Sequence, residues 1–311
     1  MPGQTVPVNF FQRNQTMSID VNMTLRKFNL HLSKSLGQNF LIDQSILKSI
    51  VQAAELTKED IVLEIGPGLG NLTAELAENA GSVMAVEIDK RLVPILKETL
   101  KDYENICIIN ADILQIDPVK ELRKELGGVE FGDASPRQLK IVANLPYYIT
   151  TPVIMKLLES GIKAKTMVFM VQKEVADRMR AAPGGKDYGA LSVAVQYYSE
   201  PDVVLEVPPH SFIPRPEVYS SVIRLELYDK PPVELSDEAL FFRLVKAAFG
   251  QRRKTLVNAL NNAGYLNLDK EEIKGMLEKT GIGERQRGET LSLKQFAQLA
   301  NLIFDGTQRK S

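Results

Sequence analysis

Cysteine and histidine are scarce in this chain of 311 residues, which excludes several kinds of functional site. A single cysteine, Cys107, allows neither an intramolecular disulfide nor a zinc cluster built of cysteines. It lies in the strand-like run NICIIN, which favours a buried structural thiol over a nucleophile. His31 and His210 are too few for a histidine-rich metal site, and neither has the sequence context of a serine hydrolase. We therefore expect no metal ion and no hydrolase triad.

Long apolar runs and an excess of charge of one sign are also lacking. No run approaches the roughly 18 apolar residues of a membrane span, and no secretory signal is recognisable. The net charge of −1 argues against a surface that is basic all over, but it allows a local basic face. We expect a cytoplasmic monomer without membrane contact. Residues 1–24 are expected to form a mobile tail, and a mitochondrial presequence is disfavoured because Arg13 is the only basic residue there.

Helix-like and strand-like patterns alternate from residue 44 onward. Repeated β-α units of this length predict an α/β fold, with a mostly parallel, Rossmann-like sheet that carries helices on both faces. Residues 127–137 are expected to form an inserted surface loop. Two prolines near residue 231 then break the pattern, and only helix-like segments follow. We predict a sheet domain over residues 25–230 and a small all-α domain over residues 231–311. The strands are expected at residues 61–66, 82–89, 104–114, 140–148, 165–172 and 219–228, and the C-terminal helices at residues 238–264, 270–281 and 292–304.

Glycines and carboxylates follow successive predicted strands. The stretch VLEIGPGLGNLTAEL places Gly66, Gly68 and Gly70 in a turn between a strand and a helix, where backbone can approach a ligand closely. Glu87 ends the next strand and can accept hydrogen bonds from ribose hydroxyls, while Asp112 follows the third strand and can accept one from an adenine amine. The alternative is three unrelated strand ends, with Asp112 capping a helix. Because no P-loop motif is present, an adenosine cofactor without a pyrophosphate, S-adenosylmethionine (SAM), fits this pocket best.

The stretch IVANLPYYIT begins as an apolar strand and ends on polar and aromatic residues. The side chain of Asn144 and the backbone carbonyl of Leu145 can both accept a hydrogen bond at the same edge of the sheet. Pro146 restricts Leu145 to an extended conformation. Two convergent acceptors suit an aromatic NH₂ group, and Tyr147 can stack on the base that carries it. The alternative is a turn that simply ends a strand.

Seven motifs in order make this chain resemble the KsgA-type (RsmA) ribosomal RNA adenine dimethyltransferases. The resemblance covers about residues 30–305. It implies a SAM-dependent methyltransferase that dimethylates the N6 atoms of two adjacent adenosines in the hairpin near the 3′ end of small-subunit rRNA, within a pre-30S particle. The matching motifs are KSLGQNFLID (34–43), EIGPGLGNLT (64–73), VEID (86–89), NADIL (110–114), NLPYYITTP (144–152), SFIPRPEVYSSVIRL (211–225) and FGQRRKTLVNAL (249–260).

The resemblance also implies roles for individual residues. Phe212 would be the second aromatic that stacks on the flipped adenine. It lies in a proline-rich stretch, PPHSFIPRPE, that we expect to be irregular loop, where the alternative role is to anchor the loop in the core. The implied cofactor contacts are Asn39, Leu41, Gly66, Glu87, Asp112 and Asn144. The implied amine-binding motif is Asn144, Leu145, Pro146 and Tyr147, and the implied RNA phosphate contacts are Arg252, Arg253 and Lys254.

Other functions share parts of this pattern. A methyltransferase of large-subunit rRNA has the same pocket and a similar strand-end motif, and a DNA adenine methyltransferase has the same amine chemistry. A basic run such as RLVKAAFGQRRK is, taken alone, most often a solvated helix face. A further alternative is mainly non-catalytic: an assembly checkpoint that occupies the immature subunit and is released upon methylation.

Overall fold

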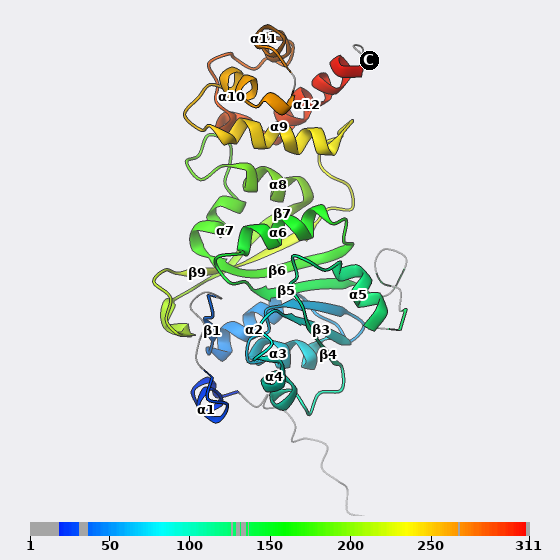
Figure 1. The fold of residues 1–311 in the computed structure, drawn as a ribbon, viewed down its shortest axis with the longest axis vertical. Coiled ribbons are helices and arrows are strands. Elements are labelled where there is room, and N and C mark those ends of the chain that lie inside the picture. Colours follow the sequence, from blue (N-terminus) through cyan, green and yellow to red (C-terminus); the bar gives the residue numbers. More distant parts are fainter. Residues whose placement is uncertain are drawn as a thin grey trace, which may run out of the picture.

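A seven-stranded sheet forms the centre of the molecule, with the strand order β4-β3-β2-β5-β6-β9-β7 (Figure 1). The computed structural model describes residues 19–30, 37–125, 127, 128, 131, 135, 137–266 and 268–308. Strands β4 to β6 in this order pair in parallel, while β9 pairs antiparallel with both β6 and β7, so the predicted mostly parallel α/β sheet is confirmed. The strands are β2 (Ile61–Ile65), β3 (Ser82–Glu87), β4 (Ile106–Asn110), β5 (Leu139–Asn144), β6 (Ala164–Gln172), β7 (Ser199–Val207) and β9 (Ser220–Leu227).

The strand order reverses between β2 and β5, which places a crevice at their carboxyl ends. The register brings these ends to the same level, because Ile65 of β2 lies opposite Val86 of β3 on one side and Ala143 of β5 on the other. Each of these three residues is followed directly by a residue predicted for the site. The fold therefore gathers Gly66, the strand-ending Glu87 and Asn144 at one edge of the sheet.

Helices cover both faces of the sheet, and apolar side chains of β2 reach both. Ile61, Leu63 and Ile65 belong to one core cluster, whereas Val62 packs in the other with residues of α2 and α3. Burial on both faces explains why this strand has an almost continuous apolar sequence. The helices of this part are α2 (Gln44–Ala53), α3 (Asn71–Asn79), α4 (Val93–Thr99), α5 (Pro118–Glu125), α6 (Thr150–Glu159), α7 (Lys173–Met179) and α8 (Ala190–Tyr198).

Several short elements differ from the sequence-based expectation. Strand β7 was not predicted, since its charged and apolar residues alternate between exposed and half-buried positions at the sheet edge. The proline-rich stretch around Phe212 is not all irregular loop, because β8 (Phe212–Ile213) pairs antiparallel with β1 (Phe40–Leu41). The register places Leu41 opposite Phe212.

The predicted tail does not extend to residue 24. Helix α1 (Val21–Lys27) begins at an N-cap, Asp20, whose side chain accepts a hydrogen bond from the backbone N–H of Met23 at 2.9 Å. Val21 is buried against Leu92 and neighbouring residues of α4. Packing of Val21 on the rest of the molecule stabilises α1, so the expectation of a mobile tail was wrong for the residues of this helix. Residues 1–18 and most of the predicted loop at 127–137 lie outside the described residues.

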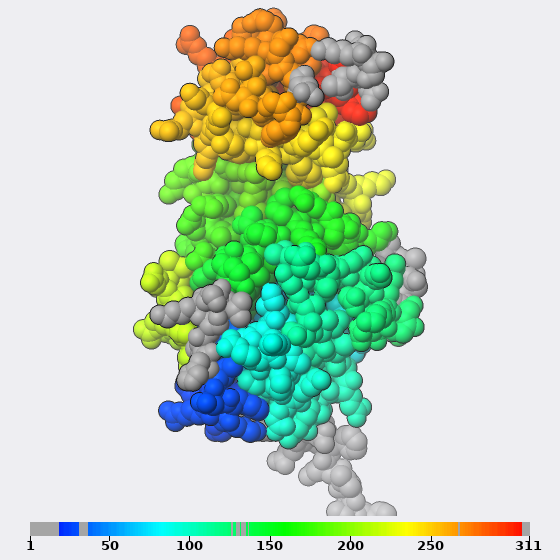
Figure 2. All heavy atoms as spheres, in the orientation of Figure 1, coloured from blue at the N-terminus to red at the C-terminus, as the bar shows by residue number. Residues whose placement is uncertain are grey.

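The C-terminal part contains helices and short 3₁₀ turns that are stacked on α8 (Figure 1). Figure 2 shows the yellow and orange atoms of this part in direct contact with the green atoms of the sheet region. Its core includes Tyr188, Val193 and Tyr197 beside Phe241, so α8 belongs to the packing of both parts. The single helix predicted for residues 238–264 is divided by a turn. The elements are α9 (Glu238–Gly250), α10 (Leu256–Asn262), η3 (Gly264–Leu266), α11 (Lys270–Lys279), η4 (Gly288–Thr290) and α12 (Leu293–Gln308). Within the part of the chain that the structure describes, no helix is long and apolar enough to cross a membrane.

Candidate active site

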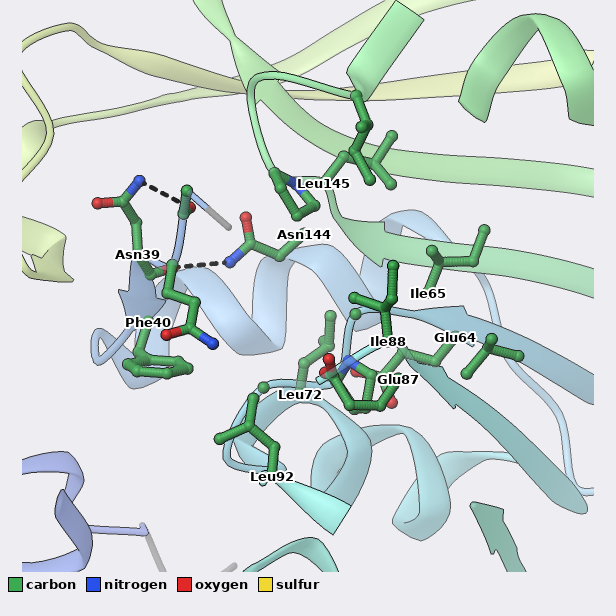
Figure 3. Close-up of a pocket in the computed structure, with 18 of the residues that line it drawn as sticks. Asn39, Phe40, Glu64, Ile65, Leu72, Glu87, Ile88, Leu92, Asn144 and Leu145 are labelled. Atoms are coloured by element: carbon green, nitrogen blue, oxygen red, sulfur yellow. Dashed lines mark hydrogen bonds between the residues drawn. The ribbon is translucent and has the colours of Figure 1, made fainter. Parts of the chain in front are cut away.

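A pocket opens at the carboxyl edge of the sheet, at the reversal between β2 and β5 (Figure 3). Segments far apart in the sequence contribute to its wall: the turn before β1, the glycine turn after β2 and the ends of β3, β4 and β5. The structure thus brings together nearly all residues expected from the sequence. Those that line the pocket are Asn39, Leu41, Gly66, Glu87, Asp112, Asn144, Leu145, Pro146 and Tyr147.

The glycine turn forms the floor of this pocket. Gly66 and Gly68 adopt φ angles of +70° and +63°, which side-chain-bearing residues rarely adopt. A Cβ atom on Gly68 would also lie only 3.0 Å from the ring of Phe40. The backbone N–H of Gly66 donates to the Val86 carbonyl at 3.0 Å, which ties the turn to the end of β3. Glycine is therefore required at Gly68, both for its backbone conformation and for the close packing of Phe40 on the turn.

Glu87 is a buried carboxylate at the end of β3. One of its oxygens, Oε1, accepts a hydrogen bond from the backbone N–H of Asp89 at 2.7 Å. Burial, assisted by the negative charge of Asp89, raises the pKa of Glu87 to about 7. Asp89 itself is held by Arg91 at 2.6 Å and by the side chain of Gln38 at 2.9 Å. The proposed ribose acceptor therefore changes its charge near neutral pH.

Two residues that line the pocket, Glu64 and Asn71, carry side-chain oxygens that are fully buried. The hydroxyl of Thr73 interacts with the Glu64 carboxyl, although not with the geometry of a full hydrogen bond. A buried carboxyl with so little compensation is favoured in its neutral, protonated form. The glycine turn and the carboxylate of Glu87, which line the pocket, fit a cofactor that carries ribose hydroxyl groups.

Replacement of Glu64 by glutamine is expected to stabilise the protein at alkaline pH. Burial, and then the charge of Glu87, raises the pKa of Glu64 from 4.5 to about 8. A carboxyl whose pKa is raised on folding stabilises the native state while it is protonated, and this contribution is lost as the pH rises toward 8. The difference in unfolding free energy between Glu64→Gln and the wild type should therefore grow from pH 5 to pH 9, by about 1 kcal/mol or more. Urea denaturation at each pH measures it, and a difference independent of pH would contradict the assignment.

Asp112 serves two purposes in the loop after β4. Its Oδ1 accepts a hydrogen bond from the backbone N–H of Leu114 at 2.9 Å, which caps a turn and not a helix, because the next helix, α5, begins only at Pro118. The residue nevertheless lines the pocket. A carboxylate has a second oxygen for a ligand, so the cap orients the group without excluding contact with a cofactor.

Asn144 is oriented by the segment that precedes β1. Its Nδ2 donates to the backbone carbonyl of Asn39 at 3.2 Å (Figure 3). With the nitrogen held in this way, the side-chain oxygen is left as the acceptor. The next peptide is fixed as well, since the N–H of Leu145 donates to Met170 on β6 at 3.1 Å and the Pro146 carbonyl accepts from Ile149 at 3.2 Å. The side chain of Asn144 and the peptides on either side of the Leu145 carbonyl are therefore fixed at the end of β5.

The two proposed stacking aromatics are placed differently. The hydroxyl of Tyr147 lies 2.7 Å from that of Ser220 at the start of β9, which fixes the far edge of a half-buried ring at the pocket. Phe212 is only 3% exposed, packs in the core with Leu47 and Val222, and does not line the pocket. Phe212 is therefore not displayed by an irregular loop: it lies in β8 with its ring in the core, as in the alternative role of a core anchor. Its role as the second stacking residue stays a prediction.

Of the three basic residues after α9, Arg252 makes contacts within the protein, whereas Arg253 and Lys254 are exposed. The guanidinium of Arg252 donates to the backbone carbonyls of Lys186 at 2.6 Å and Tyr188 at 3.2 Å, and it lies 3.7 Å from the carboxylate of Glu289. It joins the helical part to the loop before α8. Arg253 and Lys254 are exposed in the turn. Sequence reasoning did not find this distinction, since the two carbonyls that Arg252 reaches lie 66 and 64 residues away along the chain.

Pocket residues outside the matched positions escaped the sequence analysis too. Gln38 and Ile88 each neighbour a predicted residue and line the same pocket, as does Tyr148 directly after the amine-binding motif. Each of these residues could have been proposed because it is adjacent to a predicted site residue. Adjacency alone does not predict a shared pocket, because adjacent strand residues point to opposite faces and the sequence does not give the loop geometry.

Fold and pocket define a Rossmann-like SAM-dependent methyltransferase. The chain belongs to the ribosomal RNA adenine dimethylase family, whose model matches residues 29–305. A relative from Alkaliphilus oremlandii named ribosomal RNA small subunit methyltransferase A is 53% identical over 277 residues, 89% of this chain and 93% of its own length. The crystal structure of a dimethyladenosine transferase from Plasmodium falciparum is similar with a TM-score of 0.71 and 27% identity, covering 86% of this chain and 98% of that one. The 23S rRNA methyltransferase ErmE is similar with a TM-score of 0.61 and 27% identity, covering 85% and 99%.

Proposed function

We propose that this protein transfers methyl groups from SAM to the N6 atoms of two adjacent adenosines in the hairpin near the 3′ end of 16S rRNA. The observation that carries the proposal is the pair of acceptors at the end of β5, held by the Asn144–Asn39 hydrogen bond beside a pocket suited to an adenosine cofactor. We further propose that it acts as a cytoplasmic monomer on a pre-30S particle and needs no metal ion.

The residues of the site would promote methyl transfer mainly by positioning the adenine amine relative to the methyl group of SAM. SAM supplies an activated methyl group, so the protein has to hold the acceptor amine in line with it. The side-chain oxygen of Asn144 and the carbonyl of Leu145 would accept hydrogen bonds from the two amine hydrogens. This would hold the amine nitrogen with its lone pair directed at the methyl group. Tyr147, anchored through Ser220, would stack on the adenine. A monomethylated amine keeps one hydrogen, so the site must also accept a single hydrogen bond.

A small-subunit substrate is favoured over the alternatives by sequence similarity. The curated relatives named ribosomal RNA small subunit methyltransferase A are about 50% identical to this chain, compared with 27% for the 23S rRNA enzyme. The two solved structures, the Plasmodium falciparum dimethyladenosine transferase and ErmE, are each 27% identical to this chain, so the structural likeness itself favours neither substrate. A checkpoint role on the immature subunit is compatible with catalysis, and a catalytically inactive variant that traps the subunit would support it.

Mass spectrometry of rRNA from cells that lack this protein tests the proposal. We expect both adjacent adenosines of the small-subunit hairpin to be unmethylated, and expression of the wild-type gene to restore the two dimethyl groups. Persistence of dimethylation at both positions would show that the assignment is wrong. Loss of methylation in large-subunit rRNA or in DNA instead would favour one of the other methyltransferases.

Arg252 and Arg253 are expected to respond differently to replacement by glutamine. Arg253→Gln removes an exposed charge and should weaken small-subunit binding, with the slope of log affinity against log salt reduced by about 0.7–0.9. Arg252→Gln breaks the link to the Lys186 and Tyr188 carbonyls, so it should also lower the melting temperature. Filter binding over a salt series and thermal denaturation measure the two effects. Lys270→Gln, at the exposed start of α11, is the control. Equal thermal stability of the two arginine variants would contradict the distinction.

A further inference from the structure

Tyr148 lies at the mouth of the cofactor pocket, directly after the amine-binding motif, and the chemistry described above does not use it. Its side chain is 50% exposed although it lines the same pocket as Glu87 and Asp112. A half-exposed ring at the mouth of a pocket still has apolar surface that a bound ligand can cover. This makes Tyr148 a candidate contact for whatever occupies the pocket.

The ring of Tyr148 connects the segment after β5 to the segment before β1. A Cβ atom built on Gly37 would lie 3.3 Å and 3.7 Å from two atoms of the ring, and 3.8 Å from the Cβ of Pro146. The ring therefore packs directly on the backbone of Gly37, which leads into the predicted cofactor contact Asn39. The Asn144–Asn39 hydrogen bond joins the same two segments.

Tyr148 shares its pocket with the carboxylates predicted to hold the adenosine, Glu87 and Asp112. Burial raises the pKa of Tyr148, and the negative charges of Asp112 and Glu87 raise it further. The ring that packs on Gly37 therefore belongs to the lining of the pocket in which the adenosine is expected.

We propose that Tyr148 is the roof of the cofactor pocket, a positioning residue whose ring covers the bound adenosine cofactor and slows its release. The inference rests on the proposed function only in that SAM is the ligand. The aromatic ring, and not the hydroxyl, slows release of the cofactor, because the ring packs on Gly37 and has exposed apolar surface that the cofactor can cover. The hydroxyl is not needed for this covering and contributes little to retention.

Binding of S-adenosylhomocysteine to the full-length protein tests the roof, by calorimetry for the dissociation constant and by stopped-flow fluorescence for the dissociation rate. Tyr148→Ala should raise the dissociation constant about tenfold, mainly through faster dissociation. Tyr148→Phe should stay within about twofold of the wild type. Tyr219→Ala, which removes an equally exposed tyrosine outside the pocket lining, is the matched control and should change neither value.

The inference is overturned if Tyr148→Ala binds and releases the ligand as the wild type does, or if Tyr148→Phe loses as much affinity as Tyr148→Ala. These outcomes are independent of the RNA substrate. A wild-type protein that binds S-adenosylhomocysteine but does not methylate small-subunit rRNA would contradict the proposed function, while the binding data would still decide the role of Tyr148.

Discussion

Replacement of Asn144 by alanine is expected to lower the rate of methyl transfer by about a hundredfold to a thousandfold, comparable to the loss of one oriented hydrogen-bonding group in other active sites. Affinity for S-adenosylhomocysteine should fall by less than about tenfold, a neutral hydrogen bond being worth roughly 1 kcal/mol. The difference arises because the side-chain oxygen of Asn144 would hold the amine of the RNA, whereas its nitrogen only tethers the Asn39 carbonyl at 3.2 Å. Single-turnover methyl transfer and calorimetric binding measure the two quantities.

Asn105→Ala provides the matched control for this variant. Asn105 also donates from its side-chain nitrogen to a backbone carbonyl, that of Ala77 at 3.0 Å. It precedes β4, at the opposite edge of the sheet from the pocket. Its replacement should cost some stability and leave the rate of methyl transfer per folded molecule unchanged. If Asn144→Ala lost cofactor affinity and transfer rate to the same extent, the positioning role of Asn144 would be refuted.

Replacement of Glu87 by glutamine is expected to weaken cofactor binding and to remove its dependence on pH. The pKa of Glu87 is raised to about 7, chiefly by burial. Ionised Glu87 is the stronger acceptor for ribose hydroxyls, so wild-type affinity should increase from pH 6 to pH 8. Glutamine resembles the protonated carboxyl. At pH 8 the affinity of Glu87→Gln for S-adenosylhomocysteine should therefore be lower than that of the wild type by about tenfold or more, which corresponds to the loss of a charged hydrogen bond. This difference in affinity should become smaller toward pH 6.

Calorimetric titration of S-adenosylhomocysteine at pH 6, 7 and 8 measures this effect, and the ratio of the two proteins cancels ionisation of the ligand. Glu98→Gln is the control, since Glu98 is an exposed carboxylate paired with Lys27 outside the pocket. Its pH profile should match that of the wild type. A constant ratio between Glu87→Gln and wild type across this range would refute the role of the Glu87 charge.

The parts of the site that the sequence predicts are those that follow strands. Gly66, Glu87 and Asn144 are recognisable because apolar runs end at each of them and parallel strands present their carboxyl ends together. The sheet itself is predictable for a similar reason, since β2 and β5 are buried on both faces and read as apolar runs. Strand β7 at the sheet edge has no such pattern, because half-exposed residues alternate with charged ones.

The features that escape sequence reasoning are long-range contacts. The hydrogen bond that orients Asn144 joins residues 105 positions apart, and Arg252 reaches the Lys186 carbonyl across 66. The burial of Phe212 depends on a pairing of two-residue strands, β1 and β8, that is too short to leave a periodic pattern. In each case the local sequence permits several partners, and packing of the whole chain selects one.

The central claim is that this site dimethylates two adjacent adenosines of small-subunit rRNA. Purified protein, radiolabelled SAM and small subunits lacking these modifications test it most directly, with the methylated nucleosides mapped by mass spectrometry. We expect two methyl groups to be incorporated on N6 of each of two neighbouring adenosines in the 3′ hairpin, and none when Asn144→Ala replaces the wild type over the same brief reaction. Methylation of another RNA site, or no transfer to these subunits by a protein that binds SAM, would contradict it.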